Sequence, residues 1–202
     1  MRKWPLILAT RNKGKIEEIK KIMEEFPEIE VIGCEDGYVR APEVEEDGQT
    51  FYENAYKKAM TLAKYTGKLT LADDSGLEVD ALEGRPGVLS ARFAGEEGND
   101  QANNQKLLKL LEGVPEEKRT ARFKCVIVLA DWEGEVARAE GCCEGIILEE
   151  PRGANGFGYD PLFYLPQLGK TMAELSLEDK NQVSHRSRAL SQMKELFREM
   201  LK

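Results

Sequence analysis

The sequence predicts an α/β fold, and three observations support this prediction. Short apolar runs alternate with segments whose apolar residues recur at helical spacing, and the first run leads into such a segment through a polar loop. Apolar residues also occupy every second position of residues 121–129, as in a half-buried strand. Because helix-linked strands occur together with one hairpin, we expect an elongated mixed sheet flanked by helices. Residues 1–202 are expected to form a single domain of two lobes with a central cleft.

The expected elements follow one another along the chain as alternating strands and helices. Four short apolar runs are expected strands: residues 4–9, 30–33, 69–72 and 121–129, the last continued through a turn at 131–135 into a strand from 136. Four segments of helical spacing are expected helices: 16–26, 51–63, a segment around 107–111 and a last helix from near 184. The hairpin strands between 121 and about 147 are expected to build the second lobe.

Composition excludes several classes of function. The 29 basic and 37 acidic residues give a formal net charge of -8, which argues against a nucleic-acid partner held by a broad basic surface. No apolar run approaches the ~20 residues of a membrane helix, and the first residues lack the apolar core of a signal peptide. We therefore expect a cytoplasmic protein. With one histidine in the chain, a metal would be a hard cation held by oxygen atoms rather than zinc.

The loop 10–15 precedes the first expected helix and is a candidate anion site. Free backbone N–H groups and the helix dipole favour an anion there. Gly14 allows close approach of the backbone, Lys13 and Lys15 add positive charge, and Asn12 can cap the helix. The loop is not a Walker P-loop, because that motif would need glycine at position 9 and Ser or Thr at position 16. The alternative is a solvated turn that only caps the helix.

Two adjacent carboxylates, Asp73 and Asp74, directly follow the expected strand 69–72. Open α/β sheets place their sites at the carboxyl ends of strands. Like charges this close raise each other's pKa unless a cation neutralises them, and Mg²⁺ would do so while binding phosphate oxygens. The alternative is an Asx-turn. The acidic run 43–47 is mostly expected to be a solvated face, with Glu43 retained as a further metal ligand.

Two segments near the C-terminus combine aromatic, basic and glycine residues. The glycine loop, residues 153–160, contains Phe157 and Tyr159, either of which can stack on a flat ring, and Asp160, which can accept hydrogen bonds. Its alternative is a structural turn with core aromatics. A polar cluster stands at the start of the last expected helix: Lys180, Ser184, His185, Arg186 and Arg188. The planar fork of an arginine there suits a carbonyl or a phosphate.

Together and in this order, these motifs resemble the inosine triphosphate pyrophosphatase family, which hydrolyses the non-standard purine nucleotides ITP, dITP and XTP. The resemblance covers essentially the whole chain. It is carried by these segments: Leu8-Ala9-Thr10-x-Asn12-x-Gly14-Lys15 with Glu18, Phe51-x-Glu53-Asn54-Ala55, Leu71-Ala72-Asp73-Asp74-Ser75-Gly76-Leu77, Gly84-Arg85-Pro86-Gly87-Val88, Ser90-Ala91-Arg92-Phe93, Gly156-Phe157-Gly158-Tyr159-Asp160-Pro161 and Ser184-His185-Arg186.

The resemblance implies a role for each candidate residue. Asp74 would be the catalytic carboxylate that activates or orients water, close to Mg²⁺, with Glu43 as a second metal ligand. The phosphates would be held by Thr10, Arg11, Asn12, Lys13, Gly14 and Lys15, and Ser75 would also touch the substrate. The purine pocket would consist of Phe157, Gly158, Tyr159 and Asp160 with Lys180, His185 and Arg186. Water would attack the α-phosphorus and release pyrophosphate, and the relatives' state implies a homodimer.

Selectivity for the 6-oxo group would follow from hydrogen-bond donors. Arg186 or backbone N–H groups would pair with a carbonyl, whereas the amino group of adenine would leave them unpaired at a cost of ~1–3 kcal/mol. Three alternatives remain open at this stage: a pyrophosphatase for other altered nucleotides such as modified pyrimidines, a nucleotide-binding module without turnover, and a purely structural protein.

Overall fold

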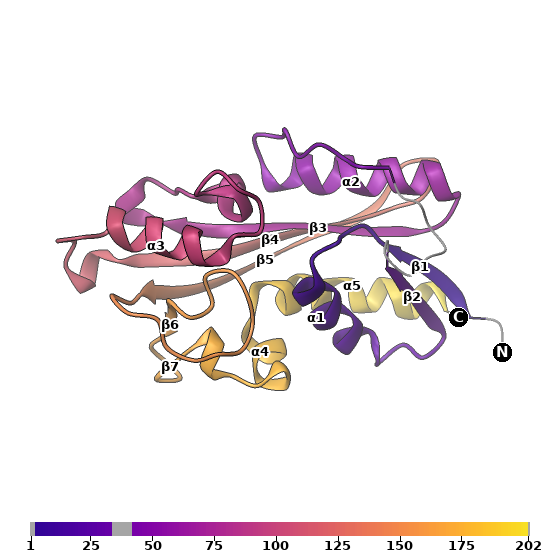
Figure 1. Ribbon diagram of the computed structural model, residues 1–202. Coiled ribbons are helices and arrows are strands. Elements are labelled where there is room, and N and C mark those ends of the chain that lie inside the picture. The colour runs from indigo at the N-terminus through magenta and orange to yellow at the C-terminus, as the bar shows by residue number, and fades with distance from the viewer. Residues whose placement is uncertain (1–2, 34–41, 202) are drawn as a thin grey trace. The chain divides into compact units, whose positions relative to one another are not determined.

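The computed structural model describes residues 3–33 and 42–201 (Figure 1). Its strands are β1 Trp4–Leu8, β2 Ile29–Gly33, β3 Thr70–Val79, β4 Thr120–Ala130, β5 Glu135–Ile147, β6 Phe163–Leu165 and β7 Lys170–Thr171. Its α-helices are α1 Lys13–Met23, α2 Phe51–Thr66, α3 Asp100–Leu110, α4 Leu177–Val183 and α5 His185–Met200. The strands form one seven-stranded sheet in the order β2-β1-β3-β4-β5-β6-β7. β1 pairs in parallel with β2 and β3, whereas β6 pairs antiparallel with β5 and β7. The predicted mixed α/β fold is confirmed.

Contacts divide the chain into two compact units. Unit 1 contains the described residues up to Asp74, then Cys125–Gly141, and the chain from Arg186. Unit 2 contains Ser75–Lys124 and Cys142–His185. The prediction that the whole hairpin builds the second lobe is wrong, since the part nearest its turn belongs to unit 1. That part carries alternating buried side chains, and they fill the core of unit 1 on both faces of β4.

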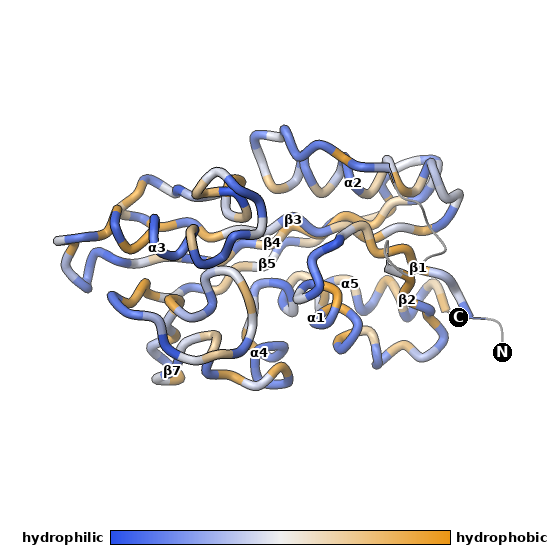
Figure 2. The backbone as a smooth tube through the Cα atoms, in the orientation of Figure 1, coloured by the Kyte–Doolittle hydropathy of each residue, from blue (hydrophilic) through white to orange (hydrophobic). Residues whose placement is uncertain are grey.

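The core of unit 1 follows the two-residue period of its strands. On one face of the sheet, Leu6 and Leu8 of β1 and Leu71 of β3 pack in a cluster that includes side chains of α1 and α5. On the other face, Ile7 and Ala72 pack in a cluster that includes side chains of α2 (Figure 1). Figure 2 shows the hydrophobic tube of β1 turning hydrophilic in the loop before α1. One face of β1 and β3 therefore packs against α1 and α5, and the other face packs against α2.

The core of unit 2 is built around the aromatic pair Phe123 and Phe163, whose ring centroids lie 4.5 Å apart. Leu107 of α3 and both Leu77 and Val79 of β3 pack in the same cluster and are fully buried. This burial explains why the predicted end of the strand at residue 72 is wrong. Because Leu77 and Val79 continue the alternation into a second core, β3 runs through both aspartates instead of stopping before them.

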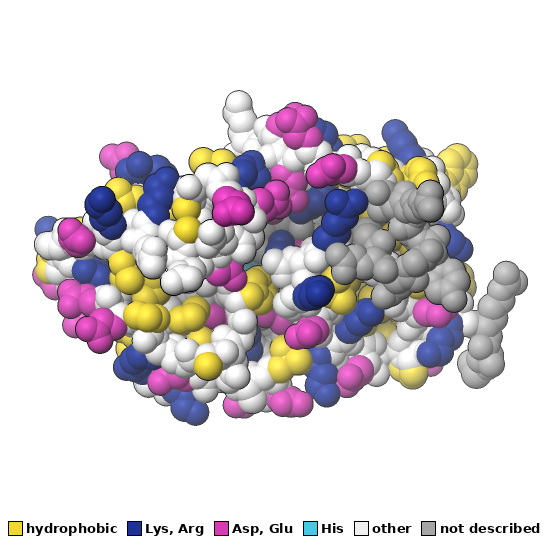
Figure 3. Space-filling view, viewed as in Figure 1, with side chains coloured by type: hydrophobic (Ala, Val, Ile, Leu, Met, Phe, Trp, Pro, Cys, Tyr) yellow, Lys and Arg dark blue, Asp and Glu magenta, His cyan; other side chains and the backbone are white. Residues whose placement is uncertain are grey.

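Helix α4 and strands β6 and β7 were not expected from the sequence. Helix α4 begins after Ser176, whose side chain accepts a hydrogen bond from the N–H of Asp179 at 3.0 Å. Strands β6 and β7 follow the glycine loop. Among the helices that the structure describes, none is long and apolar enough to cross a bilayer. Figure 3 shows acidic and basic side chains interspersed over the described surface that it draws.

Candidate functional site

The loop after β1 forms the predicted strand–loop–helix unit. Asn12 is the N-cap of α1, and its side chain accepts a hydrogen bond from the N–H of Lys15 at 3.1 Å. The hydroxyl of Thr10 accepts one from the N–H of Asn12 at 3.2 Å. Arg11 and Lys13 are exposed, and Gly14 is half-buried. The predicted capping role of Asn12 is confirmed, and the phosphate-binding role of the loop stays a prediction.

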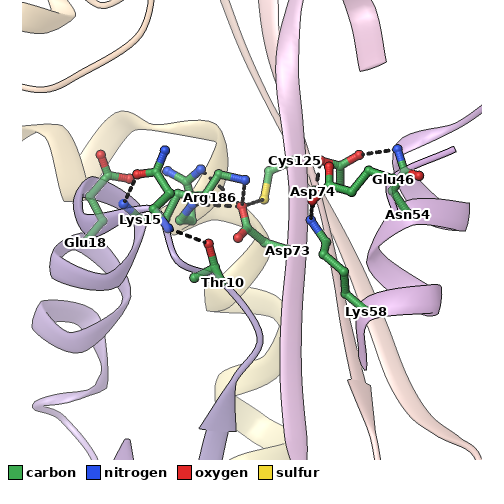
Figure 4. Close-up of polar contacts among 11 residues, drawn as sticks. Thr10, Lys15, Glu18, Glu46, Asn54, Lys58, Asp73, Asp74, Cys125 and Arg186 are labelled. Atoms are coloured by element: carbon green, nitrogen blue, oxygen red, sulfur yellow. Dashed lines mark hydrogen bonds and ion pairs between the residues drawn. The ribbon is translucent and has the colours of Figure 1, made fainter. Parts of the chain in front are cut away.

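Asp73 and Asp74 lie in the middle of β3 and point to opposite faces of the sheet (Figure 4). Asp73 shares the face of Leu71, which α1 and α5 cover, and Asp74 shares the face of Ala72, which α2 covers. The two carboxylates therefore do not point towards one shared cation. The sequence had suggested such a cation because it predicted that the strand ends just before the two aspartates. Each has its own set of partners.

Asp73 belongs to a buried charge network, defined here as Lys15, Glu18, Asp73 and Arg186. The Oδ2 atom of Asp73 lies 3.0 Å from Lys15 Nζ and accepts hydrogen bonds from Arg186 Nη2 at 3.1 Å and Nε at 3.2 Å. Arg186 Nη1 donates to Glu18. Burial would raise the pKa of Asp73, but Lys15, Arg186 and Lys58 outweigh it and hold the pKa well below its usual value. Asp73 is therefore a permanent anion near neutral pH.

Asp74 has the opposite electrostatic character. Its Oδ2 atom accepts a hydrogen bond from Asn54 Nδ2 at 3.0 Å, and its Oδ1 atom lies 3.7 Å from Lys58 Nζ. Burial raises the pKa of Asp74, and the charges of Lys58 and Lys15 counter only part of that rise. The result is a carboxylate that accepts a proton more readily than an exposed aspartate does. This property suits a general base.

Helix α2 delivers both contacts to Asp74. Asn54 and Lys58 are one turn apart and so share a face of the helix. Asn54 is fully buried, and its Oδ1 atom accepts a hydrogen bond from the N–H of Gly48 at 2.8 Å. A Cβ atom at Gly48 would lie 2.6 Å from that oxygen, so only glycine fits there. Gly48 thus fixes which end of the Asn54 amide faces Asp74.

The acidic loop contributes Glu46 to this arrangement. Glu46 Oε1 lies 2.8 Å from the same Lys58 Nζ that contacts Asp74, whereas Glu43 is exposed. Within residues 3–33 and 42–201, no three His, Cys, Asp or Glu side chains form a group able to hold a metal ion. The metal role of Glu43 stays a prediction, and Glu46 is the acid that the structure associates with Asp74.

Unit 2 brings together three of the residues predicted for the purine pocket. Asp160 Oδ2 accepts hydrogen bonds from the N–H of Phe157 at 2.9 Å and from Lys180 Nζ. The ammonium of Lys180 also lies 4.7 Å from the centroid of the Phe157 ring. Asp160 and Lys180 are buried, whereas Phe157 is half-buried. Phe157 and Asp160 of the glycine loop thus both contact one ammonium group from α4.

The other predicted pocket residues have different surroundings. Tyr159 is buried in the core of unit 2 and donates its hydroxyl to the carbonyl of Ser90 at 2.9 Å, as the core-aromatic alternative expects. His185 stacks on Phe123 with ring centroids 4.8 Å apart. Arg186 has its guanidinium in the charge network of unit 1. Ser75 follows Asp74 in β3 and is half-buried.

Comparison with known proteins decides the family. The model of the Ham1 family matches residues 6–196. The chain belongs to the Ham1 family. It is 56% identical to a dITP/XTP pyrophosphatase of Desulforamulus reducens over 95% of this chain and 94% of that protein. It is also 56% identical to a dITP/XTP pyrophosphatase of Shouchella clausii over 94% of each chain.

The solved structures agree with this assignment. The Staphylococcus aureus Ham1 protein is 45% identical and superposes with a TM-score of 0.84, covering 98% of this chain and 100% of that one. The fold described above is therefore that of the Ham1 family. The resemblance inferred from the sequence motifs is confirmed.

Sequence reasoning missed three residues of this candidate site: Glu46, Asn54 and Lys58. A signal for two of them was present, since Asn54 and Lys58 are polar residues on the helix face that carries Ala55, Ala59 and Leu62. Polar side chains on a buried apolar face need partners there. The sequence alone could not show that this partner is Asp74.

Proposed function

We propose that this chain is a hydrolase that converts the non-standard purine nucleoside triphosphates ITP, dITP and XTP to monophosphates and pyrophosphate. Its relatives of 56% identity are named dITP/XTP pyrophosphatases, and they match nearly its full length. The observation that carries the proposal is Asp74, a buried carboxylate of raised pKa held by Asn54 and Lys58. A raised pKa suits proton transfer to this carboxylate, which nucleotide binding alone would not require.

Asp74 acts in this proposal on the attacking water. With Oδ2 engaged by Asn54, the Oδ1 side of the carboxylate accepts the proton as water attacks the α-phosphorus. The raised pKa makes that transfer more favourable than it would be to an exposed aspartate. The bond between the α-phosphorus and the bridging oxygen breaks, and pyrophosphate leaves without a covalent intermediate. Lys58 restrains the base and keeps positive charge beside it.

Lys15 and the loop 10–15 bind the phosphates. A nucleoside triphosphate carries about four negative charges, so local cations and backbone N–H groups at the start of α1 are needed to hold it. Lys15 is already oriented by the Oδ2 atom of Asp73, and Arg186 donates to the same oxygen. The charge network therefore places an ammonium group at the phosphate loop without adding free negative charge.

Mg²⁺ fits the donor set near Asp74. Asp74 and Glu46 supply carboxylate oxygens around one ammonium group, and magnesium typically uses one or two carboxylates together with phosphate oxygens and waters. These two residues would hold the ion, with Glu43 of the same loop as the alternative ligand. When bound, the ion supplies charge neutralisation for the phosphates. Lys58 lies between Asp74 and Glu46 and keeps their carboxylates close together.

The base is recognised in this proposal by the glycine loop. Phe157 offers a half-buried ring for stacking, and Lys180 and the backbone N–H groups offer donors to a 6-oxo group. Three nitrogens of Arg186 already donate to Asp73 and Glu18. The backbone N–H groups are therefore the better candidates of the two donor types expected from the sequence.

The test is pyrophosphate release from ITP, XTP, dITP, ATP and GTP, each with Mg²⁺ and with EDTA. We expect Mg²⁺-dependent release from the first three and far slower release from ATP and GTP. Equal rates on all five would discard the selectivity, and faster turnover of modified pyrimidine triphosphates would redirect it. Nucleotide binding without any release would support a binding module. We also propose that the protein is a cytoplasmic homodimer. Light scattering of the purified protein measures its molar mass and so tests the number of subunits.

A further inference from the structure

Helix α3 contacts Gly158 of the glycine loop at both backbone polar groups of that residue. Asp100 Oδ2 accepts a hydrogen bond from the N–H of Gly158 at 2.7 Å, and Asn104 Nδ2 donates one to the carbonyl of Gly158 at 2.8 Å. Asp100 and Asn104 are one turn apart and share a face of α3. Their contacts span 58 and 54 residues of sequence. We call this pair of contacts the α3 clamp.

The conformation of Gly158 explains why a clamp has an effect there. Gly158 has φ +60, a left-handed conformation that side-chain-bearing residues rarely adopt, and a Cβ atom there would meet nothing within 4 Å. Glycine is thus required by the backbone and not by space. An unrestrained glycine visits many conformations, so two hydrogen bonds that fix it remove the main freedom of the loop.

The two neighbours of Gly158 differ in how they are held. Tyr159 is anchored in the core through its ring and its hydroxyl bond to Ser90. Phe157 is half-buried, with its ring beside Lys180 and its N–H on Asp160. Because Gly158 joins the anchored ring to the half-buried one, its peptide orientation sets the direction in which the Phe157 ring points.

The α3 clamp is not needed to build α3 itself. The N-cap of the helix is Asn99, whose side chain accepts a hydrogen bond from the N–H of Ala102 at 3.0 Å. The preceding segment is held by Asn103, which accepts a hydrogen bond from the N–H of Ala94 at 2.7 Å and donates to Ala91. Capping and tethering therefore have their own residues. Asp100 and Asn104 are left with the glycine loop as their distinct contact.

We propose that Asp100 and Asn104 are positioning residues for the nucleobase, which through Gly158 fix the Phe157 ring for stacking and thereby set the preference for purines. This inference rests on the proposed function, since it takes the glycine loop as the base site. Neither residue touches substrate. Their loss lowers affinity for a nucleotide with a large flat base more than for one with a small base.

The decisive variant is Asn104→Asp. It keeps the size of the side chain but replaces the donor to Gly158 with a second carboxylate oxygen, which repels the carbonyl. We expect the KM for dITP to rise roughly tenfold, as for a buried hydrogen bond lost, with kcat changed by less than about twofold. The KM for dUTP, a pyrimidine, should rise much less. The matched control is Gln105→Asp, an exposed neighbour on the same helix.

Asp100 gives a rescue test. Asp100→Ala removes the acceptor for the Gly158 N–H and should raise the KM for dITP as Asn104→Asp does. Asp100→Asn retains a carbonyl oxygen at the same place and should restore most of the wild-type KM. Thermal unfolding of all variants separates a loss of fold, which lowers the active fraction and hence kcat, from a change in KM.

The outcomes separate this inference from the proposed function. Absence of pyrophosphate release by the wild-type protein from dITP and XTP would refute the proposed function. Calorimetry of dITP binding in EDTA would then still test the α3 clamp, because it compares the affinity of wild type and variants without turnover. Weaker dITP binding or higher KM in Asn104→Asp, but not in Gln105→Asp, supports the clamp. Equal loss for dITP and dUTP, or no loss, overturns it.

Discussion

Unit 1 and unit 2 hold their polar residues in contrasting ways. Unit 1 buries charged side chains in pairs and triads around β3, so that Arg186 serves both Asp73 and Glu18. Unit 2 fixes its glycine loop mainly through backbone groups, together with the buried pair of Asp160 and Lys180. The difference fits the proposed division of tasks, in which the charges of unit 1 serve phosphate binding and proton transfer and the backbone groups of unit 2 serve the flat base.

The two designs also differ in their energetic risk. A buried carboxylate costs several kcal/mol of lost hydration, which only well-placed cations and hydrogen bonds offset. Removing one member of the charge network exposes that cost at once. The glycine loop risks less because most of its hydrogen bonds have a neutral backbone group as one partner, and each is worth about 1–3 kcal/mol. Substitutions in unit 1 should therefore have the larger effects.

The largest expected effect is on turnover, from Asp74→Asn. Loss of a general base lowers kcat by about 10²–10⁴-fold, while the amide keeps the size of the side chain and the fold. Steady-state pyrophosphate release measures the change, and circular dichroism with a thermal unfolding curve serves as the control. Turnover near that of wild type in Asp74→Asn would remove Asp74 from the catalytic role.

The second prediction compares the buried ion pairs of the two units. Arg186→Met leaves Asp73 and Glu18 buried without their arginine and should lower the free energy of unfolding by about 3–5 kcal/mol. Lys180→Met should cost less, because Asp160 still accepts the N–H of Phe157. Urea unfolding at pH 7 measures both. A larger loss in Lys180→Met would invert the comparison.

The pH dependence of the Arg186→Met effect gives a further check. The pKa of Asp73 is lowered on folding, so its ionised form stabilises the fold above the unfolded pKa of about 4, and that contribution is lost as the pH falls below it. Removing Arg186 diminishes this contribution. The difference in free energy of unfolding between wild type and Arg186→Met should therefore narrow as the pH falls from about 5 to about 3. Urea unfolding curves of both proteins, recorded at steps of roughly one pH unit over this range, measure it.

The third prediction concerns the proposed metal ligands of unit 1. Glu46→Gln should raise the Mg²⁺ concentration for half-maximal rate roughly tenfold, whereas Glu43→Gln should change it by less than about twofold. The reason is that Glu46, and not the exposed Glu43, shares Lys58 with Asp74. Titration of activity with Mg²⁺ distinguishes the two carboxylates. The reverse order would restore Glu43 as the ligand implied by the family resemblance.

The smallest effects are expected from helix caps, where the two units should behave alike in stability. Asn12→Ala and Ser176→Ala each remove an N-cap hydrogen bond and should cost about 1 kcal/mol. Only Asn12→Ala should also raise the KM for nucleotide, because Asn12 belongs to loop 10–15, which we propose binds the phosphates. Similar KM changes in both variants would argue that loop 10–15 has only a capping role.

Sequence predicted the elements whose signals are local and periodic. The apolar spacing of α1 and α5 and the alternation in β4 were sufficient, and Asn12 was identified as a cap from its position. Helix α4 was missed because its seven residues include only two apolar ones, Leu177 and Val183, too few for a period.

The error at β3 has a non-local cause. The polar segment Asp73-Asp74-Ser75-Gly76 has the composition of a turn. It continues a strand because Arg186, 113 residues away, neutralises Asp73, and Asn54, 20 residues away, binds Asp74. Composition and spacing do not report such pairings. The sequence centred the candidate site on Asp74, whose catalytic role stays a prediction, while the contacts of Asn54, Lys58 and Glu46 required the structure.

The alternation of side chains along β3 acts as a reading frame for the site. Since neighbouring residues face opposite sides, a deletion of one residue between Thr70 and Ala72 would move Asp74 into the place of Asp73, beside Lys15 and Arg186, and Ser75 into the place beside Asn54 and Lys58. The charge network would keep a carboxylate, whereas the site beside α2 would lose its own. A shift of one residue in this strand would therefore remove the proposed general base while the buried charges stay paired.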